Sequence, residues 1–118
     1  MKHDKIDLAK KELVQLIIKN QEASKDGNYK LVNSTSERIW KLRDNIEKEF
    51  GLEVLKDLLE HDNPDVQVSV AHWLLPIYEE VCIMLLRSIG KKKIPHTSFD
   101  ARLILSEWLD EPLEFDHK

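Results

Sequence analysis

The sequence predicts an all-α protein of about six antiparallel helices. Its three glycines and four prolines fall between segments of helical spacing and never inside one. Within those segments apolar residues recur at intervals of three and four, which is the spacing of a buried helix face. No segment alternates apolar and polar residues in the sustained way that a strand requires, although residues 66–70 come closest.

The first two helices are expected over about residues 4–25 and 28–50. Gly27 lies between them and favours the left-handed backbone that ends a helix. The polar run 33–36 could interrupt the second helix, because serine and threonine side chains compete for backbone hydrogen bonds. In that case Ser34 would cap a restart.

A third, leucine-rich helix is expected over residues 52–61. Asp62 or Asn63 should then cap a fourth helix, with Pro64 at its first position. Asp65 would complement the positive end of the helix dipole.

A fifth helix is expected to begin at once at Pro76, where the fourth ends. It is apolar on nearly all sides up to Ile89, which predicts the most buried element of the fold. Residues 91–96 form the one extended loop. Thr97 or Ser98 should cap the sixth and last helix.

Length and composition favour one domain over residues 1–118, with residues 111–118 as a flexible acidic tail. The chain has 22 acidic and 18 basic residues, and this net charge of −4 weighs against binding to nucleic acid. No apolar run is long enough to cross a membrane. Acidic residues near the N-terminus are unlike an export signal, so we expect a cytoplasmic protein.

Signatures of catalysis are missing from the sequence. It has no glycine-rich phosphate loop and no nucleophile elbow, and Cys82 lies in an apolar run that predicts a buried thiol. The five histidines include no pair four residues apart, so we expect neither a metal nor another cofactor. His61 is expected to contact carbonyl groups at its helix end. We predict that the protein is not an enzyme.

Acidic residues gather in two stretches, one between residues 47 and 65 and one at the C-terminal end. Such stretches are either solvated helix faces or a docking surface for a basic partner. The candidate contacts are Glu53, Asp57, Glu60, Asp65, Glu107, Asp110 and Glu111. The three tryptophans are expected to pack between helices, with Trp40 or Trp108 as a possible exposed anchor for a partner.

Residues 52–71 resemble a HEAT repeat in the positions of Asp62, Val66 and Ala71, whereas Gln67 stands where that repeat usually has an arginine. Over most of the chain the sequence resembles a small bacterial domain family of uncharacterised function. Three segments carry this resemblance: 33–42, 58–66 and 101–108. The resemblance implies a right-handed α/α superhelix of the HEAT/armadillo type. Domains of this kind occur among immunity proteins that neutralise bacterial toxins.

Together these observations favour a protein-binding module, most concretely an immunity protein that blocks a cognate basic toxin domain such as a nuclease. The alternative is a HEAT-like adaptor that binds a non-toxic protein. We expect a monomer apart from the complex, with no membrane contact. A second candidate surface is the inner side of such a superhelix, which would carry Glu37, Trp40, Gln67, His72 and Arg102.

Overall fold

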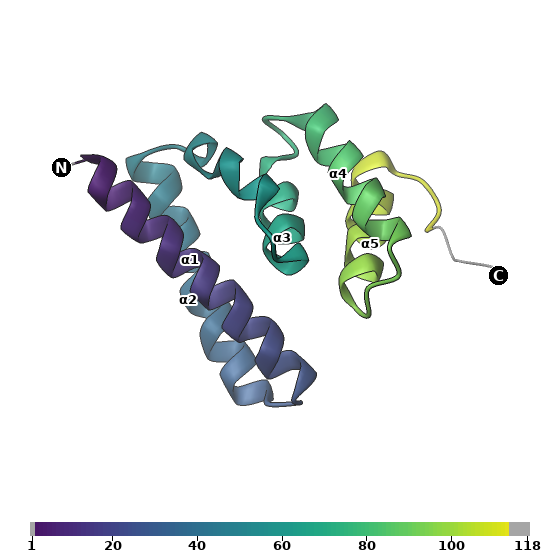
Figure 1. Ribbon diagram of the computed structural model, residues 1–118, viewed down its shortest axis with the longest axis horizontal. Helices are drawn as coiled ribbons and strands as arrows, with labels where there is room; N and C mark the ends of the chain where they lie inside the picture. The colour runs from purple at the N-terminus through teal and green to yellow at the C-terminus, as the bar shows by residue number, and fades with distance from the viewer. Residues whose placement is uncertain (1, 114–118) are drawn as a thin grey trace. The chain divides into compact units, whose positions relative to one another are not determined.

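The computed structural model describes residues 2–113 and confirms the all-α class. The described residues contain no strand and form six helices (Figure 1). These are α1 (Lys2–Lys25), α2 (Tyr29–Glu49), the 3₁₀ helix η1 (Leu52–Glu60), α3 (Pro64–Leu74), α4 (Glu79–Lys91) and α5 (Thr97–Leu109). Of the expected acidic tail, residues 111–113 have no regular structure and residues 114–118 lie outside the described residues.

The chain divides into two compact units, an N-terminal unit up to Asp57 and a C-terminal unit from Leu58 onward. Each unit has its own buried apolar side chains, as the next paragraphs show. The single domain and the superhelical arrangement expected for the whole chain stay predictions.

The N-terminal unit is built on a hairpin in which α1 and α2 lie side by side (Figure 1). Gly27 makes the expected left-handed turn, with a φ of 72°. Asn28 caps α2, since its side chain accepts a hydrogen bond from the backbone N–H of Leu31. The buried apolar side chains of the hairpin are Leu13, Leu16, Ile17, Ala23 and Ile46.

The polar run 33–36 does not interrupt α2, which is continuous. The side-chain amide of Asn20 on α1 donates to the backbone oxygen of Val32 and to the hydroxyl oxygens of Thr35 and Ser36, at 2.9 to 3.1 Å. Thr35 is itself buried and donates its hydroxyl to the backbone oxygen of Leu31. The polar run is therefore the hydrogen-bonded contact between the two helices.

The leucine-rich segment is helical as expected, but it adopts 3₁₀ rather than α geometry over its nine residues. The backbone N–H of His61, just after it, donates to the oxygen of Leu58 three residues earlier. In a 3₁₀ helix side chains three residues apart eclipse one another. Leu52, Leu55 and Leu58 have this spacing; the first two are buried and the third is half-buried. The period of three thus suits the observed geometry as far as Leu55, after which Leu59, on the next face of the helix, is the buried residue.

The start of α3 matches the prediction closely. The side chain of Asn63 accepts hydrogen bonds from the backbone N–H groups of Asp65 and Val66, and Pro64 takes the first helical position. In the C-terminal unit α3 packs against α4 and α5, and these two helices pack against each other. The buried core of this unit includes Val66, Val70, Ala71, Leu74, Cys82, Leu86, Ile89 and Ala101.

Two expectations about the fifth helix are wrong. It begins at Glu79, because Pro76 lies in a turn in which the N–H groups of Ile77 and Tyr78 both donate to the oxygen of Leu74. It is also not buried all round: α3 and α5 cover one side only, and Val81 and Met84 are exposed.

Gly90 does not lie between helices, as the sequence suggested, but inside α4, where it is buried. A Cβ atom at Gly90 would come within 3.0 Å of Cγ of Arg102 on α5. The guanidinium of Arg102 donates to the backbone oxygen of Gly90 at 2.8 Å. The glycine therefore permits the close packing of α4 on α5.

The prediction that Thr97 or Ser98 caps α5 is also wrong. The hydroxyl of Thr97 donates to Oδ1 of Asp65 on α3 at 2.6 Å. The Ser98 hydroxyl is buried, donates to the backbone oxygen of Ile89, and accepts from the N–H of Ile94. Both side chains join elements of the C-terminal unit instead of ending a helix.

Among residues 2–113 there is no helix that combines the length and the apolarity required to cross a membrane.

Candidate binding surface

The seven acidic residues predicted from the sequence do not form one surface. Glu53 and Asp57 belong to the N-terminal unit and the other five to the C-terminal unit. Asp57 is paired with Lys10 on α1, with 2.6 Å between Nζ and Oδ1. A cationic partner would have to displace this lysine, so Asp57 is a weaker candidate than its exposure suggests.

Asp65 has a structural role in the C-terminal unit. Its carboxylate accepts the hydrogen bond from Thr97 and stands in the first turn of α3, where the helix dipole favours a negative charge. Glu60, at the end of η1, is exposed.

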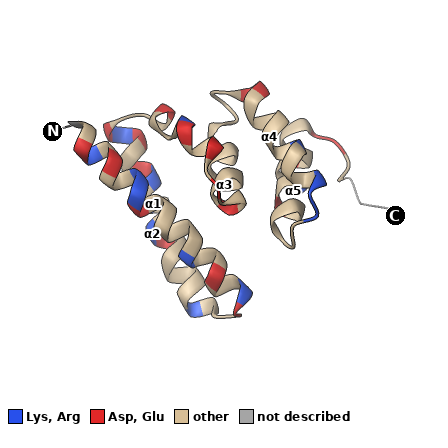
Figure 2. Ribbon diagram, in the orientation of Figure 1, with Lys and Arg blue, Asp and Glu red and all other residues tan. Residues whose placement is uncertain are grey.

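Glu107, Asp110 and Glu111 are exposed at the C-terminal end of α5. Between them lies Trp108, which is 40% exposed and whose indole N–H donates to Oε2 of Glu79 at 2.8 Å. This bond places the first turn of α4 beside the last turn of α5 (Figure 2). We call these five residues the acidic end: Glu79, Glu107, Trp108, Asp110 and Glu111.

Positive charge is missing from the sequence around the acidic end. Neither residues 76–86 nor residues 103–113 include a lysine, an arginine or a histidine. Among the described residues the nearest bases along the chain are His72, Arg87 and Arg102, and Arg102 is engaged with the backbone of Gly90. The two segments that carry the acidic end therefore supply no basic side chain to neutralise its carboxylates.

The position of these acids is unfavourable for the helix itself. The C-terminal end of a helix carries partial negative charge, and the last turn of α5 has no basic residue to balance it. Asp110 moreover has a φ of 54°, in the left-handed region where glycine is the usual residue. The end of α5 therefore departs from helix preferences in both charge and backbone conformation. Such departures at one position are characteristic of functional sites.

The second predicted surface is divided in the same way as the first. Glu37 and Trp40 lie in the N-terminal unit, where Glu37 pairs with Lys41 at 3.3 Å. Trp40 is 55% exposed, and the guanidinium carbon of Arg43 lies 5.2 Å from the centre of its ring. This arrangement is a cation–π contact at the surface of α2.

The members of the second surface in the C-terminal unit mostly have internal partners. The amide of Gln67 donates to the backbone oxygen of Leu59 at 2.8 Å and so ties α3 to the last turn of η1. Arg102 holds α4 as described above. His72 is exposed. Gln67 and Arg102 thus act in the packing of helices.

Two groups that sequence reasoning considered for chemistry are Cys82, which is buried, and His61, which accepts a backbone hydrogen bond. Burial raises the pKa of the Cys82 thiol, which disfavours the reactive thiolate. His61 does not contact carbonyl groups as predicted, since its Nδ1 accepts a hydrogen bond from the N–H of Asn63 at 3.0 Å. Within residues 2–113 no three side chains of His, Cys, Asp or Glu converge in a way that could hold a metal ion.

Glu79 is the member of the acidic end that sequence reasoning missed. Its partner Trp108 is 29 positions away, and no local pattern links the two residues. The expectation that the fifth helix begins at Pro76 also hid the fact that Glu79 stands in a first turn. Comparison of the chain with protein-family models, with curated proteins and with solved structures gave no match.

Proposed function

We propose that the protein is a non-catalytic binding module whose acidic end binds a basic surface of another protein. The observation that carries the proposal is the set of carboxylates around the half-exposed Trp108, with no basic residue in either contributing segment. Charge complementarity of this kind accelerates association and selects partners, and tryptophan is enriched among residues that anchor an interface.

The charge of the C-terminal unit supports a basic partner. Residues 58–118 include eleven acidic and six basic residues, whereas residues 1–57 include eleven acidic and twelve basic residues. The net charge of the chain therefore comes from the C-terminal unit. A cationic partner would be attracted to the unit that carries the acidic end.

The most concrete form of this function is an immunity protein that acts in the cytoplasm and blocks a cognate toxin domain. Its support is the resemblance of segments 33–42, 58–66 and 101–108 to a domain family that occurs among such proteins. If the toxin is a nuclease, the carboxylates of the acidic end would occupy the places of substrate phosphates, while Trp108 packs against an apolar part of the partner.

An adaptor that binds a non-toxic protein is the second candidate. The exposed Trp40 favours it, because the residues around this side chain carry both signs of charge, with Arg43 over the ring. A surface of that composition suits a partner without strong net charge.

The test is co-expression with the protein encoded by the gene immediately upstream, followed by purification and measurement of association rates. The triple variant Glu107→Gln, Asp110→Asn, Glu111→Gln should lower the association rate at low salt by about tenfold or more, because electrostatic steering acts mainly on that rate. Raising the ionic strength should have the same effect on the wild type. Relief of toxicity in cells would identify the immunity form.

The matched control is the triple variant Glu22→Gln, Glu47→Gln, Glu49→Gln, which removes three exposed carboxylates from α1 and α2 in the other unit. This variant should associate at the wild-type rate. Equal losses in both variants would show that only net charge matters and would contradict the acidic end. A partner that binds but is not toxic would favour the adaptor, and the absence of any complex would refute the proposal for this partner.

A further inference from the structure

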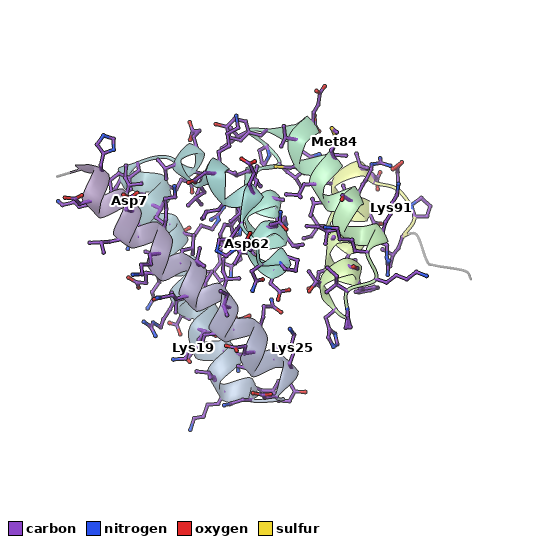
Figure 3. The ribbon with its side chains drawn as sticks, in the orientation of Figure 1. Asp7, Lys19, Lys25, Asp62, Met84 and Lys91 are labelled. Atoms are coloured by element: carbon purple, nitrogen blue, oxygen red, sulfur yellow. The ribbon has the colours of Figure 1, made fainter. Side chains whose placement is uncertain are left out.

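An apolar row runs along the exposed side of α4. Val81 is 49% and Met84 is 71% exposed, and Ile77 in the preceding turn is 42% exposed. Met84 and Lys91, both labelled in Figure 3, lie on this same helix. Large apolar side chains that are exposed together mark a surface that another molecule covers.

The spacing of this row is that of a coiled-coil seam. Val81 and Met84 stand three residues apart, and the exposed, polar Ser88 follows four residues later, which is the spacing of the inner positions of one heptad. Glu80 and Arg87 each stand one residue before an inner position, and both are exposed. They therefore lie seven residues apart on the same flank of the seam.

The charges of α4 are arranged to complement a second copy of the same helix. Acidic residues occupy its first turn, and the exposed bases Arg87 and Lys91 lie in its second half. In an antiparallel pair of helices, equivalent flanks face each other. With the two-fold axis between residues 83 and 84, Glu80 of each copy meets Arg87 of the other, and the two Met84 side chains meet at the centre.

We propose that two copies of the protein associate through α4 in this antiparallel, two-fold arrangement. The contact is self-complementary, as two-fold interfaces must be. It is also small, on the order of 1,000 Å² or less, which belongs to the class of weak and transient interfaces. The proposal differs from the monomer expected from the sequence, since it gives a dimer that depends on concentration.

This face is separate from the acidic end. The carboxylate of Glu79 is held by Trp108 on α5, whereas Val81, two residues on, lies about 200° around the helix. Dimer formation and binding of a basic partner thus use different sides of the C-terminal unit, and each can fail without the other.

The experiment is sedimentation velocity of the full chain from about 10 μM to 1 mM, a range suited to weak contacts. The wild type should shift from monomer toward dimer. Met84→Glu should abolish the shift, since it places two carboxylates at the centre of the seam. Leu103→Glu, at an exposed apolar position on α5, is the control and should leave the shift unchanged. Circular dichroism checks that each variant keeps its helices.

Charge reversal tests the orientation. Glu80→Arg alone brings like charges together at both ends of the pair, and so does Arg87→Glu alone, so each variant should weaken the dimer by about tenfold or more. An equal mixture of the two variants restores both opposite-charge contacts. It should therefore associate about as strongly as the wild type.

A wild-type chain that stays monomeric at 1 mM would overturn the proposal, as would a Met84→Glu variant that still associates. Single charge variants that associate like the wild type would also overturn it, because the antiparallel pair places Glu80 against Arg87. Such a result would fit a parallel pair, in which these two residues do not meet. Failure of the mixture to recover would exclude the two-fold geometry.

Discussion

At the scale of single residues, the strongest departures from helix rules occur where α5 ends. Asp110 combines a left-handed backbone, with a φ of 54°, and a negative charge at the negative end of a helix dipole. Glycine in its place would relieve both effects. The carboxylate therefore lowers the stability of the protein, and its presence is consistent with a role in binding.

We predict that Asp110→Gly raises the free energy of unfolding by about 0.5–1 kcal/mol, because glycine adopts positive φ without steric cost. Urea denaturation followed by circular dichroism measures the change. Asp110→Asn is the control, since it removes the charge but keeps a side chain, and it should give a smaller gain. A glycine variant no more stable than the wild type would contradict this account.

Asp100, in the first turn of α5, is expected to make stability depend on pH. Burial raises the pKa of this carboxyl above its ordinary value of 3.8, the negative charge of Asp65 raises it further, and His96 opposes the shift. A carboxyl whose pKa is higher in the folded than in the unfolded state contributes most to stability when it is protonated. Its contribution to the free energy of unfolding therefore declines as the pH rises from the unfolded-state pKa through the folded-state pKa.

The prediction is that Asp100→Asn is more stable than the wild type at pH 7, and that the difference in unfolding free energy vanishes below about pH 3, where both states of the wild type bind the proton. Thermal denaturation from pH 3 to pH 7 provides the measurement. A difference that stayed constant over this range would mean that the carboxyl does not titrate as inferred.

At the scale of the elements, burial was harder to predict than helix formation. The fifth helix is apolar on nearly every side, and its sequence alone therefore indicated a central position. Only α3 and α5 cover it in the C-terminal unit, so Val81 and Met84 remain exposed. An apolar composition shows that a helix can be buried. The number of neighbouring helices decides how much of its surface is covered.

The hairpin of α1 and α2 depends on one polar side chain. We predict that Asn20→Ala lowers the free energy of unfolding by about 1–2 kcal/mol, because the variant loses hydrogen bonds to Val32, Thr35 and Ser36. Asn33→Ala, at an exposed position of α2, measures the gain in helix propensity alone. Equal stability of the two variants in urea would show that the Asn20 contacts contribute nothing.

At the scale of the whole molecule, the helices and the cap of α3 could be predicted because their causes are local. Asn63 and Pro64 act within a few residues, and so does the turn at Gly27. Side-chain contacts between elements could not be predicted. The bonds from Trp108 to Glu79 and from Thr97 to Asp65 join positions 29 and 32 residues apart.

The prediction of the candidate surfaces from the sequence was limited in the same way, because contacts between elements were unknown. Sequence reasoning identified the acids and tryptophans that form a surface but grouped them by stretches of the chain. In the structure the ion pair from Lys10 to Asp57 removes one acid, and the bond of Trp108 adds Glu79. A stretch of like charge thus becomes a defined surface only when the partners of each side chain are known.

The spacing of the leucines in η1 restricts insertions and deletions within this helix. One residue added or lost within Leu52–Glu60 would turn every later side chain of the helix by about 120°, since a 3₁₀ helix has three residues per turn. Leu55 or Leu59 would then face water. Homologous chains should therefore tolerate exchanges between apolar residues here, while insertions and deletions should be confined to the connections between helices.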